Sequence, residues 1–165
     1  MFELKLLRKE AVPAALEKAT RYRLLNEPVE AESICLDILR ADPGNQQALV
    51  TLLLSLTDQL ETSYAVSSTQ AQEVLGGITD EYEHAYYAGI ICERQAKARL
   101  VQSFPGTTFD AYDLLYEAMT LYEKADMMRP AGNDDARLRW NTCVRIIQRN
   151  NLVPRPGDDR EPPLE

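Results

Sequence analysis

One pattern of small and bulky residues occurs twice in this chain and restricts its fold more than any other feature. Toward the C-terminal end, a small, an aromatic and a second small residue stand four and three apart, and a proline follows five residues later: Ala118, Tyr122, Ala125 and Pro130. The same spacing recurs at Ala31, Cys35, Ile38 and Pro43. Residues three and four apart lie on one face of a helix. Each set therefore predicts a helix with one packing stripe, ended by a proline.

Apolar periodicity predicts seven helices separated by short breaks. Their expected ranges are 12–25, 29–41, 46–60, 67–76, 80–102, 108–129 and 134–150. The segments NEP, ADPGN, GG, FPGTT and RPAGND contain the proline, glycine and asparagine residues that typically end helices. No part of the sequence alternates well enough to be a strand, so the pattern predicts an all-α protein.

Corresponding positions of the first helix in each pair recur at an interval of about 34 residues. Ala19 and Leu53 are 34 residues apart, and Leu53 and Gly89 are 36 apart. Small residues in the middle of a helix let a paired helix approach closely, while large flanking residues fill the grooves. One such pair cannot bury its apolar face alone, so neighbouring pairs are expected to stack.

These residues resemble the tetratricopeptide repeat (TPR) family, whose unit is an antiparallel helix pair of 34 residues. The positions that fit the TPR pattern in the first repeat are Ala15, Lys18, Ala19, Tyr22, Ala31, Cys35, Ile38 and Pro43. Those that fit in the third repeat are Ala85, Ala88, Gly89, Cys92, Ala118, Tyr122, Ala125 and Pro130. The second repeat fits in its first helix, at Leu49, Leu52, Leu53 and Leu56. The resemblance implies a right-handed superhelix of antiparallel helix pairs, a TPR-like α–α solenoid over residues 1–150.

The segment 151–165 has a different composition. It contains four of the nine prolines and no apolar stripe. Such segments are typically disordered or polyproline-like. We therefore expect a proline-rich tail without fixed structure; a docking motif for another domain is the alternative.

The third repeat departs from the family's length. Gly89 and Ala118 are 29 residues apart, whereas Ala19 and Ala31 are 12 apart, an excess of 17. This predicts a third hairpin lengthened by about eight residues per helix. The added apolar residues are expected to join the two long helices. We also hypothesise that the hairpin tip, at Phe104 and Phe109, offers an apolar contact to a partner or a second copy.

The net charge and the cysteines limit which classes of partner and which cellular compartment are expected. The net charge is −8 and the isoelectric point about 4.8. Nucleic acid and anionic membranes need basic patches, so neither is expected as the main partner. The start MFELKLLRKE is too charged for a signal peptide. The three cysteines have no metal-type spacing and no evident disulfide framework, which indicates a reducing cytoplasm.

The sequence contains little that indicates catalysis. His84 is the only histidine; Glu81 precedes it by three residues, the spacing of di-iron helices, but those sites need a second such motif. Cysteines at packing positions are expected to be buried and inert. No glycine-rich phosphate loop is present. We therefore expect no catalytic residues, metal or cofactor, and not an enzyme.

The TPR resemblance implies a concave groove, lined by the first helix of each pair, that binds an extended peptide or a helix. The expected contact residues are Tyr86, Ile90, Arg94, Arg137, Asn141 and Arg145. Tyrosine and arginine are enriched at binding hot spots. Equally, these arginines could pair with neighbouring acidic residues and simply solvate the face. The positions that clamp a C-terminal carboxylate in chaperone-binding TPR proteins are here Leu16, Thr20, Val50 and Leu54, so that ligand is not expected.

The favoured function is a non-catalytic protein–protein interaction adaptor, present as a monomer or weak homodimer. Small acidic TPR chaperones of secretion systems also resemble the chain in length and charge. A self-assembling structural subunit, with the long hairpin as its interface, is the alternative from a different class.

Overall fold

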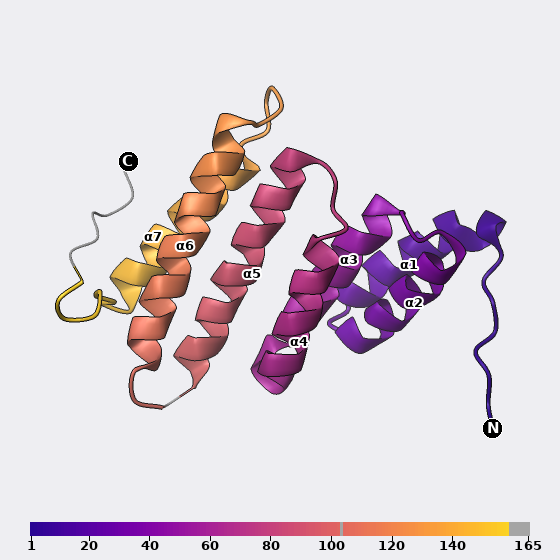
Figure 1. Cartoon of the computed structure of the whole chain (residues 1–165), viewed down its shortest axis with the longest axis horizontal. Helices are drawn as coiled ribbons and strands as arrows, with labels where there is room; N and C mark the ends of the chain where they lie inside the picture. Colours follow the sequence, from indigo (N-terminus) through magenta and orange to yellow (C-terminus); the bar gives the residue numbers. More distant parts are fainter. Residues whose placement is uncertain (103, 159–165) are drawn as a thin grey trace. The chain divides into compact units, whose positions relative to one another are not determined.

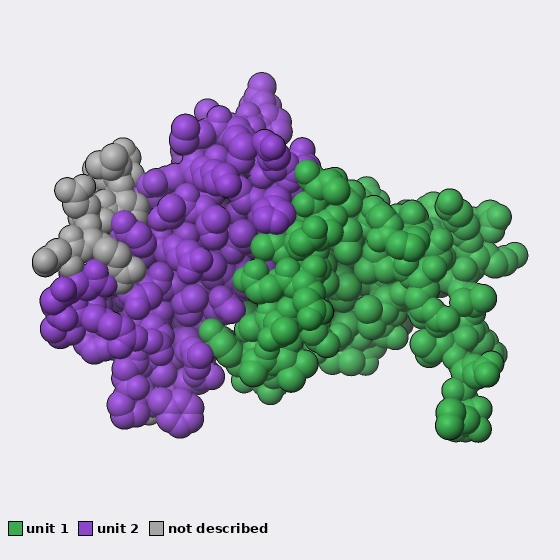
Figure 2. Space-filling model, viewed as in Figure 1, with its two compact units in different colours: residues 1–79 green, residues 80–165 purple. Residues whose placement is uncertain are grey.

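The computed structural model describes residues 1–102 and 104–158. Over these residues the protein is all-helical, with one short 3-10 helix, η1 (Lys9–Ala11), seven α-helices and no strand. The chain forms two compact units, residues 1–79 and 80–165, which Figure 2 colours separately. The all-α expectation is confirmed, and each unit is described by itself below.

Unit 1 contains two helical hairpins, α1 (Val12–Leu24) with α2 (Pro28–Ala41) and α3 (Gln46–Thr57) with α4 (Leu60–Leu75) (Figure 1). Pro28 opens α2, where its missing N–H costs no hydrogen bond. Asn45 caps α3, because its side-chain oxygen accepts a hydrogen bond from the Ala48 N–H at 2.9 Å. The expected stripe of α2 is a packing surface: Ala31, Cys35 and Ile38 are all 0% exposed.

The α3–α4 boundary differs from the expectation. Helix α3 ends at Thr57, and α4 begins at Leu60 rather than near residue 67, with a non-helical Ser63 near its start. The reason is tertiary: the Gln59 amide donates hydrogen bonds to Glu32 Oε2 at 2.9 Å and to the Ser55 carbonyl at 3.1 Å. These contacts fix the turn between α3 and α4. Sequence periodicity does not reveal them, because the residues around the turn are polar and form no apolar stripe.

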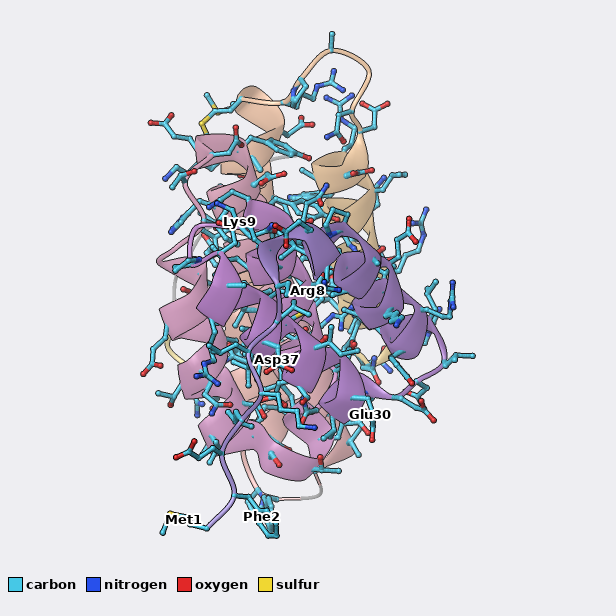
Figure 3. All side chains as sticks on the ribbon, turned by 90° about the vertical axis from the view of Figure 1, so that its right-hand side faces the viewer. Met1, Phe2, Arg8, Lys9, Glu30 and Asp37 are labelled. Carbon is cyan, nitrogen blue, oxygen red and sulfur yellow. The ribbon has the colours of Figure 1, made fainter. Side chains whose placement is uncertain are left out.

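The N-terminal residues 1–8 lie outside any helix. Leu7 packs against the core cluster of Val12, Ile38 and Ala48. Phe2, by contrast, is exposed, and Figure 3 shows it beside Met1 at the free end of the segment. Leu7 is therefore the apolar contact of this segment with the core cluster of unit 1.

Unit 2 contains α5 (Glu81–Val101), α6 (Thr107–Met127) and α7 (Asp135–Arg149). The first two run side by side as a long antiparallel hairpin, and α7 packs against α6 (Figure 1). Helices α5 and α6 have 21 residues each, against 13 in α1 and 14 in α2. The hairpin is thus longer by eight and seven residues per helix, which matches the expected extension.

The second stripe is the centre of the unit 2 core. Ala118, Tyr122 and Ala125 are 0% exposed. Gly89 of α5 faces the Tyr122 ring so closely that an added Cβ would lie 2.5 Å from Cε1 and 2.7 Å from Cδ1. A buried aromatic ring on α6 thus requires the absence of a side chain at this position of α5.

The described part of the tail, residues 151–158, contacts the helices of unit 2 through two of its residues. Leu152 is 7% exposed, and its N–H donates to the Ile147 carbonyl at 3.0 Å. Arg155 forms ion pairs with Asp110 and Asp113 of α6. Leu152 and Arg155 are thus held against the helices, although the composition of the segment suggests disorder. Residues 159–165, the remainder of that expectation, lie outside the described residues.

Within the ranges that the structure describes, no helix is both long enough and apolar enough to span a membrane.

Candidate functional site

A groove of about 760 Å³ lies between α6 and α7 of unit 2. Its apolar and aromatic lining consists of Tyr112, Tyr116, Met119, Tyr122, Ala136, Trp140, Val144 and Ile147. Its polar lining consists of Glu123, Asp126, Arg137, Asn141 and Gln148. An apolar floor with a few polar groups at the edge is the usual composition of a ligand-binding groove.

Helical spacing produces both walls of this groove. On α6, Tyr112, Tyr116 and Met119 follow one another at intervals of four and three residues. On α7, Trp140, Val144 and Ile147 have the same intervals and are half-buried. Residues at these intervals form one face of a helix. The two apolar faces meet along their inner edges, and their outer parts remain accessible.

Two polar contacts join the walls at one end of the groove. The indole Nε1 of Trp140 donates a hydrogen bond to Glu123 Oε1 at 3.1 Å. The Arg137 guanidinium donates to Asp126 Oδ2 at 2.9 Å, and this hydrogen bond raises the pKa of Arg137. Both contacts connect the C-terminal part of α6 with the first half of α7.

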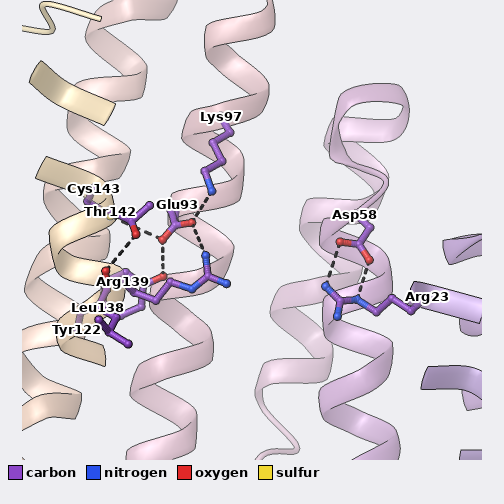
Figure 4. Close-up of polar contacts among 9 residues, drawn as sticks. All are labelled: Arg23, Asp58, Glu93, Lys97, Tyr122, Leu138, Arg139, Thr142 and Cys143. Atoms are coloured by element: carbon purple, nitrogen blue, oxygen red, sulfur yellow. Dashed lines mark hydrogen bonds and ion pairs between the residues drawn. The ribbon is translucent and has the colours of Figure 1, made fainter. Parts of the chain in front are cut away.

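A buried carboxylate beneath the groove holds α7 to the long hairpin (Figure 4). Glu93 of α5 is 0% exposed, and its carboxylate accepts hydrogen bonds from Lys97 Nζ at 2.7 Å and Arg139 Nη1 at 3.2 Å. The Tyr122 hydroxyl of α6 donates at 3.1 Å. The Cys143 thiol of α7 lies 3.8 Å away. Buried charges persist when they are paired and hydrogen-bonded in this way.

Two groups beside this carboxylate, the Tyr122 hydroxyl and the Cys143 thiol, have raised pKa values because they are buried. Burial raises the pKa of the Tyr122 hydroxyl well above its ordinary value, and the negative charge of Glu93 adds to the effect. The pKa of the Cys143 thiol is also raised, first by burial and then by the negative charge of Glu93. Both groups therefore stay protonated at neutral pH, as their contacts with the carboxylate require.

The structure brings only part of the expected contact set together. Arg137 and Asn141 both line the groove, whereas Arg145 is exposed on α7 beside it. Tyr86 is half-buried, with its ring 5.9 Å from that of Tyr122. Arg94 is half-buried and has interaction partners. In unit 2, the wall facing α7 in this groove comes from α6 and not from α5.

Ile90 differs most from the expectation. Its side chain is 1% exposed, so it is buried and has no surface for a ligand. Apolar residues at first-helix positions can face either a groove or a neighbouring helix, and sequence spacing alone does not distinguish the two.

The two phenylalanines at the hairpin tip differ in their exposure to solvent. Phe104 is 69% exposed, as a contact residue would be. Phe109 is half-buried, and the Arg155 guanidinium lies 5.6 Å from the centre of its ring. Ser103, between the two helices, lies outside the described residues.

The aromatic residues that give the groove its character were not among the expected contacts. Tyr112, Tyr116 and Trp140 lie at positions where the sequence also permits simple packing. One signal for them exists: α6 has a second apolar stripe, beside that of Ala118, Tyr122 and Ala125. A helix with two apolar faces has two neighbours, or one neighbour and one open surface.

The cysteines show no sign of nucleophilic activation. All three are free and buried. Burial raises the pKa of Cys35 and of Cys92 to about 12, and the thiolate is the reactive form of cysteine. His84 is exposed on α5. Among residues 1–102 and 104–158, no group of three or more histidine, cysteine, aspartate or glutamate side chains is placed to hold a metal ion.

No protein-family model matches the chain, and comparisons with curated proteins and with solved structures find no match either. The fold and the groove therefore define the chain as an all-helical protein with an aromatic groove between two of its helices.

Proposed function

We propose that this chain is a non-catalytic protein-interaction adaptor that binds a peptide or helix of a partner protein in the groove between α6 and α7. The observation that carries the proposal is the groove itself, about 760 Å³ with three accessible aromatic residues, Tyr112, Tyr116 and Trp140. Tyrosine, tryptophan, methionine and arginine are the residues enriched in protein interfaces. Volumes of this size hold several side chains of a ligand.

The proposal includes a TPR-like architecture. Helix pairs with small residues facing bulky ones, as at Gly89 and Tyr122, support it, and so does the lengthened third pair. A reducing compartment such as the cytoplasm fits three free cysteines in a chain of this kind.

Capture of a partner by groove variants tests the proposal. The full chain, immobilised, is exposed to lysate of its source cells beside a variant carrying Tyr112→Ser, Tyr116→Ser and Val144→Ser. We expect the wild type to retain one protein in stoichiometric amount, identified by mass spectrometry. The variant is expected to lose at least about nine-tenths of it, since anchors in a groove dominate binding energy.

Leu138→Ser provides the matched control, because Leu138 is a 62% exposed apolar residue on α7 that does not line the groove. It should retain the partner as well as the wild type. Thermal unfolding by circular dichroism must show all chains folded. Equal retention by the wild type and the groove variant contradicts the proposal.

Exposed apolar residues favour a second candidate, a self-assembling structural subunit. Phe104 at the hairpin tip is 69% exposed and Phe2 of the N-terminal segment 103% exposed. Exposed phenylalanines at a hairpin tip and in a terminal segment are available for contact with a second copy. Recovery of further copies of the chain and of no other protein, in the same experiment, supports this candidate against the first.

A further inference from the structure

We propose that the exposed N-terminal segment, residues 2–6, of one copy of this chain binds in the α6–α7 groove of a second copy, where a partner protein competes with it. The inference rests on the proposed function only in taking the groove as a ligand site, and it names a further ligand by its sequence, FELKL. Three observations support it: the apolar side of the segment, the dimensions of the groove and the charges of both.

The segment has an exposed apolar side. Phe2, Leu4 and Leu6 are 103%, 73% and 77% exposed. They alternate with Glu3 and Lys5, and alternate side chains of an extended segment point to the same side. Because apolar side chains gain free energy when they leave water, three of them within five residues favour binding to an apolar surface.

Unit 1 holds one end of the segment and presents the rest. Leu7 packs against the core cluster of unit 1, and the backbone of Arg8 is extended, with φ −73° and ψ 143°. Figure 3 shows the chain leading from Arg8 away to Met1. A segment that is anchored at one end loses less conformational freedom on binding than a free peptide does, so its binding costs less.

The groove has the length and the spacing for this segment. Phe2 and Leu6 are four residues apart, about 13 Å in an extended chain. The groove follows α6 from Tyr112 to Asp126, fourteen residues or about 21 Å of helix. Apolar side chains follow one another about every 6.6 Å in the segment and about every 4.5 to 6 Å along either wall. All three apolar side chains of the segment therefore fit within the groove and meet apolar neighbours there.

The charges of the two walls favour a ligand without net charge. Helix α6 contains five carboxylates and one lysine, a net charge of −4, and α7 contains four arginines and one aspartate, a net charge of +3. A ligand with a strong charge of one sign is repelled by one of the walls, because like charges brought together are unfavourable. Residues 2–6 contain one glutamate and one lysine, so their net charge is zero.

The proposed contact joins different surfaces of two copies. The segment belongs to unit 1 and the groove to unit 2, so each copy both donates a segment and offers a groove. Contacts between unlike surfaces repeat from copy to copy, until they close into a ring or continue as an open chain. Association is therefore expected to rise with protein concentration, and each contact needs one intact segment and one intact groove.

Complementation between two variants of the full chain tests this pairing. The segment variant carries Phe2→Ser, Leu4→Ser and Leu6→Ser, which leaves all charges and the groove unchanged. The groove variant is the one used for partner capture, and its segment is intact. In sedimentation velocity, we expect the wild type to associate with rising concentration and each variant alone to remain monomeric. An equimolar mixture of the two variants should form a 1:1 pair and nothing larger, because one segment and one groove remain intact in it.

Leu24→Ser combined with Leu25→Ser and Val66→Ser is the matched control. These three apolar side chains of unit 1 are 79%, 63% and 63% exposed and lie outside both the segment and the groove. The control variant should associate as the wild type does. Circular dichroism must show that every variant is folded.

A free peptide of residues 2–9, FELKLLRK, tests the site without any substitution in the groove. Trp140 is the only tryptophan of the chain and lines the groove. The peptide should shift the Trp140 emission of the segment variant to the blue and saturate, since it excludes water from the indole. A peptide with serine in place of Phe2, Leu4 and Leu6 should bind at least about tenfold more weakly, because buried anchors carry most of the binding energy.

Three results would overturn the inference. One is a wild type that stays monomeric up to its solubility limit, or a segment variant that associates as the wild type does. The second is a mixture of the two folded variants that forms no 1:1 pair. The third is a difference in Trp140 emission between the wild type and the segment variant that is independent of protein concentration, because the segment then occupies the groove of its own chain.

Failure of the inference and failure of the proposed function give different results. If the two variants pair as expected but the groove variant captures a partner as well as the wild type does, the inference stands and the proposed function fails. If capture of a partner requires the groove and the wild type is monomeric, the proposed function stands and the inference fails.

Discussion

Replacing both Lys97 and Arg139 by methionine is expected to lower the free energy of unfolding by about 3–5 kcal/mol, the usual cost of leaving a buried charge unpaired. Glu93 is 0% exposed, and these two side chains are its cationic partners in the described structure. Methionine replaces the apolar stem of either residue but removes the charge. The Tyr122 hydroxyl remains as a donor to the carboxylate, yet one neutral hydrogen bond cannot balance a charge in the protein interior. Urea unfolding followed by circular dichroism measures the loss.

Arg23→Met is the matched control for this prediction. Arg23 pairs with Asp58 at 2.7 Å in unit 1, but both side chains remain about one-fifth to one-quarter exposed, at 24% and 21% (Figure 4). Such pairs contribute at most about 1 kcal/mol. Adding Glu93→Leu to the double variant should recover most of the lost stability, because an apolar replacement of a whole buried ion network is often neutral. A double variant no less stable than Arg23→Met would show that Glu93 is not the structural centre of unit 2.

Gly89→Ala is expected to destabilise the protein by about 1–3 kcal/mol, the cost of overpacking a filled core. The expected sign of this change in stability is informative, since alanine in a helix is normally favoured over glycine by about 1 kcal/mol. Here the new Cβ would lie 2.5 Å from the Tyr122 ring, which is 0% exposed and cannot move outward. The Tyr122 hydroxyl also donates a hydrogen bond to Glu93, so displacement of the ring weakens the network below the groove.

Gly44→Ala provides the control for the glycine substitution, because nothing lies within 4 Å of a Cβ at that position. Its effect should fall between no change and a stabilisation of about 1 kcal/mol. In a Tyr122→Leu background the penalty of Gly89→Ala should shrink markedly, since contacting residues show non-additive effects. Stabilisation by Gly89→Ala in the wild-type background would contradict the close packing of α5 on α6.

The packing stripes of this protein could be predicted from sequence because each is local to one helix. Ala31, Cys35 and Ile38 on α2 and Ala118, Tyr122 and Ala125 on α6 are all 0% exposed. The spacing of three and four residues is a direct consequence of helix geometry. The extra length of α5 and α6 followed from counting between equivalent positions, since insertions do not alter the stripes on either side.

The remaining features depend on which neighbour covers each face, and that information is not local. Ile90 and Tyr116 are both bulky apolar residues on long helices, yet the first is buried and the second lines a groove. The start of α4 at Leu60 depends on the contact of Gln59 with Glu32, 27 residues away in sequence. The packing of residues 151–158 depends on Arg155 meeting Asp110, 45 residues away. Sequence periodicity contains none of these pairings.

Amide hydrogen exchange of the full chain with and without its captured partner tests the central claim most directly, because it locates binding on the helices themselves. The claim is that the partner binds the groove between α6 and α7. Slowed exchange is therefore expected in residues 112–126 and 136–148, with α1 to α4 unchanged. Protection confined to unit 1, or to the exposed hairpin tip at Phe104, would place the binding surface elsewhere and contradict the account.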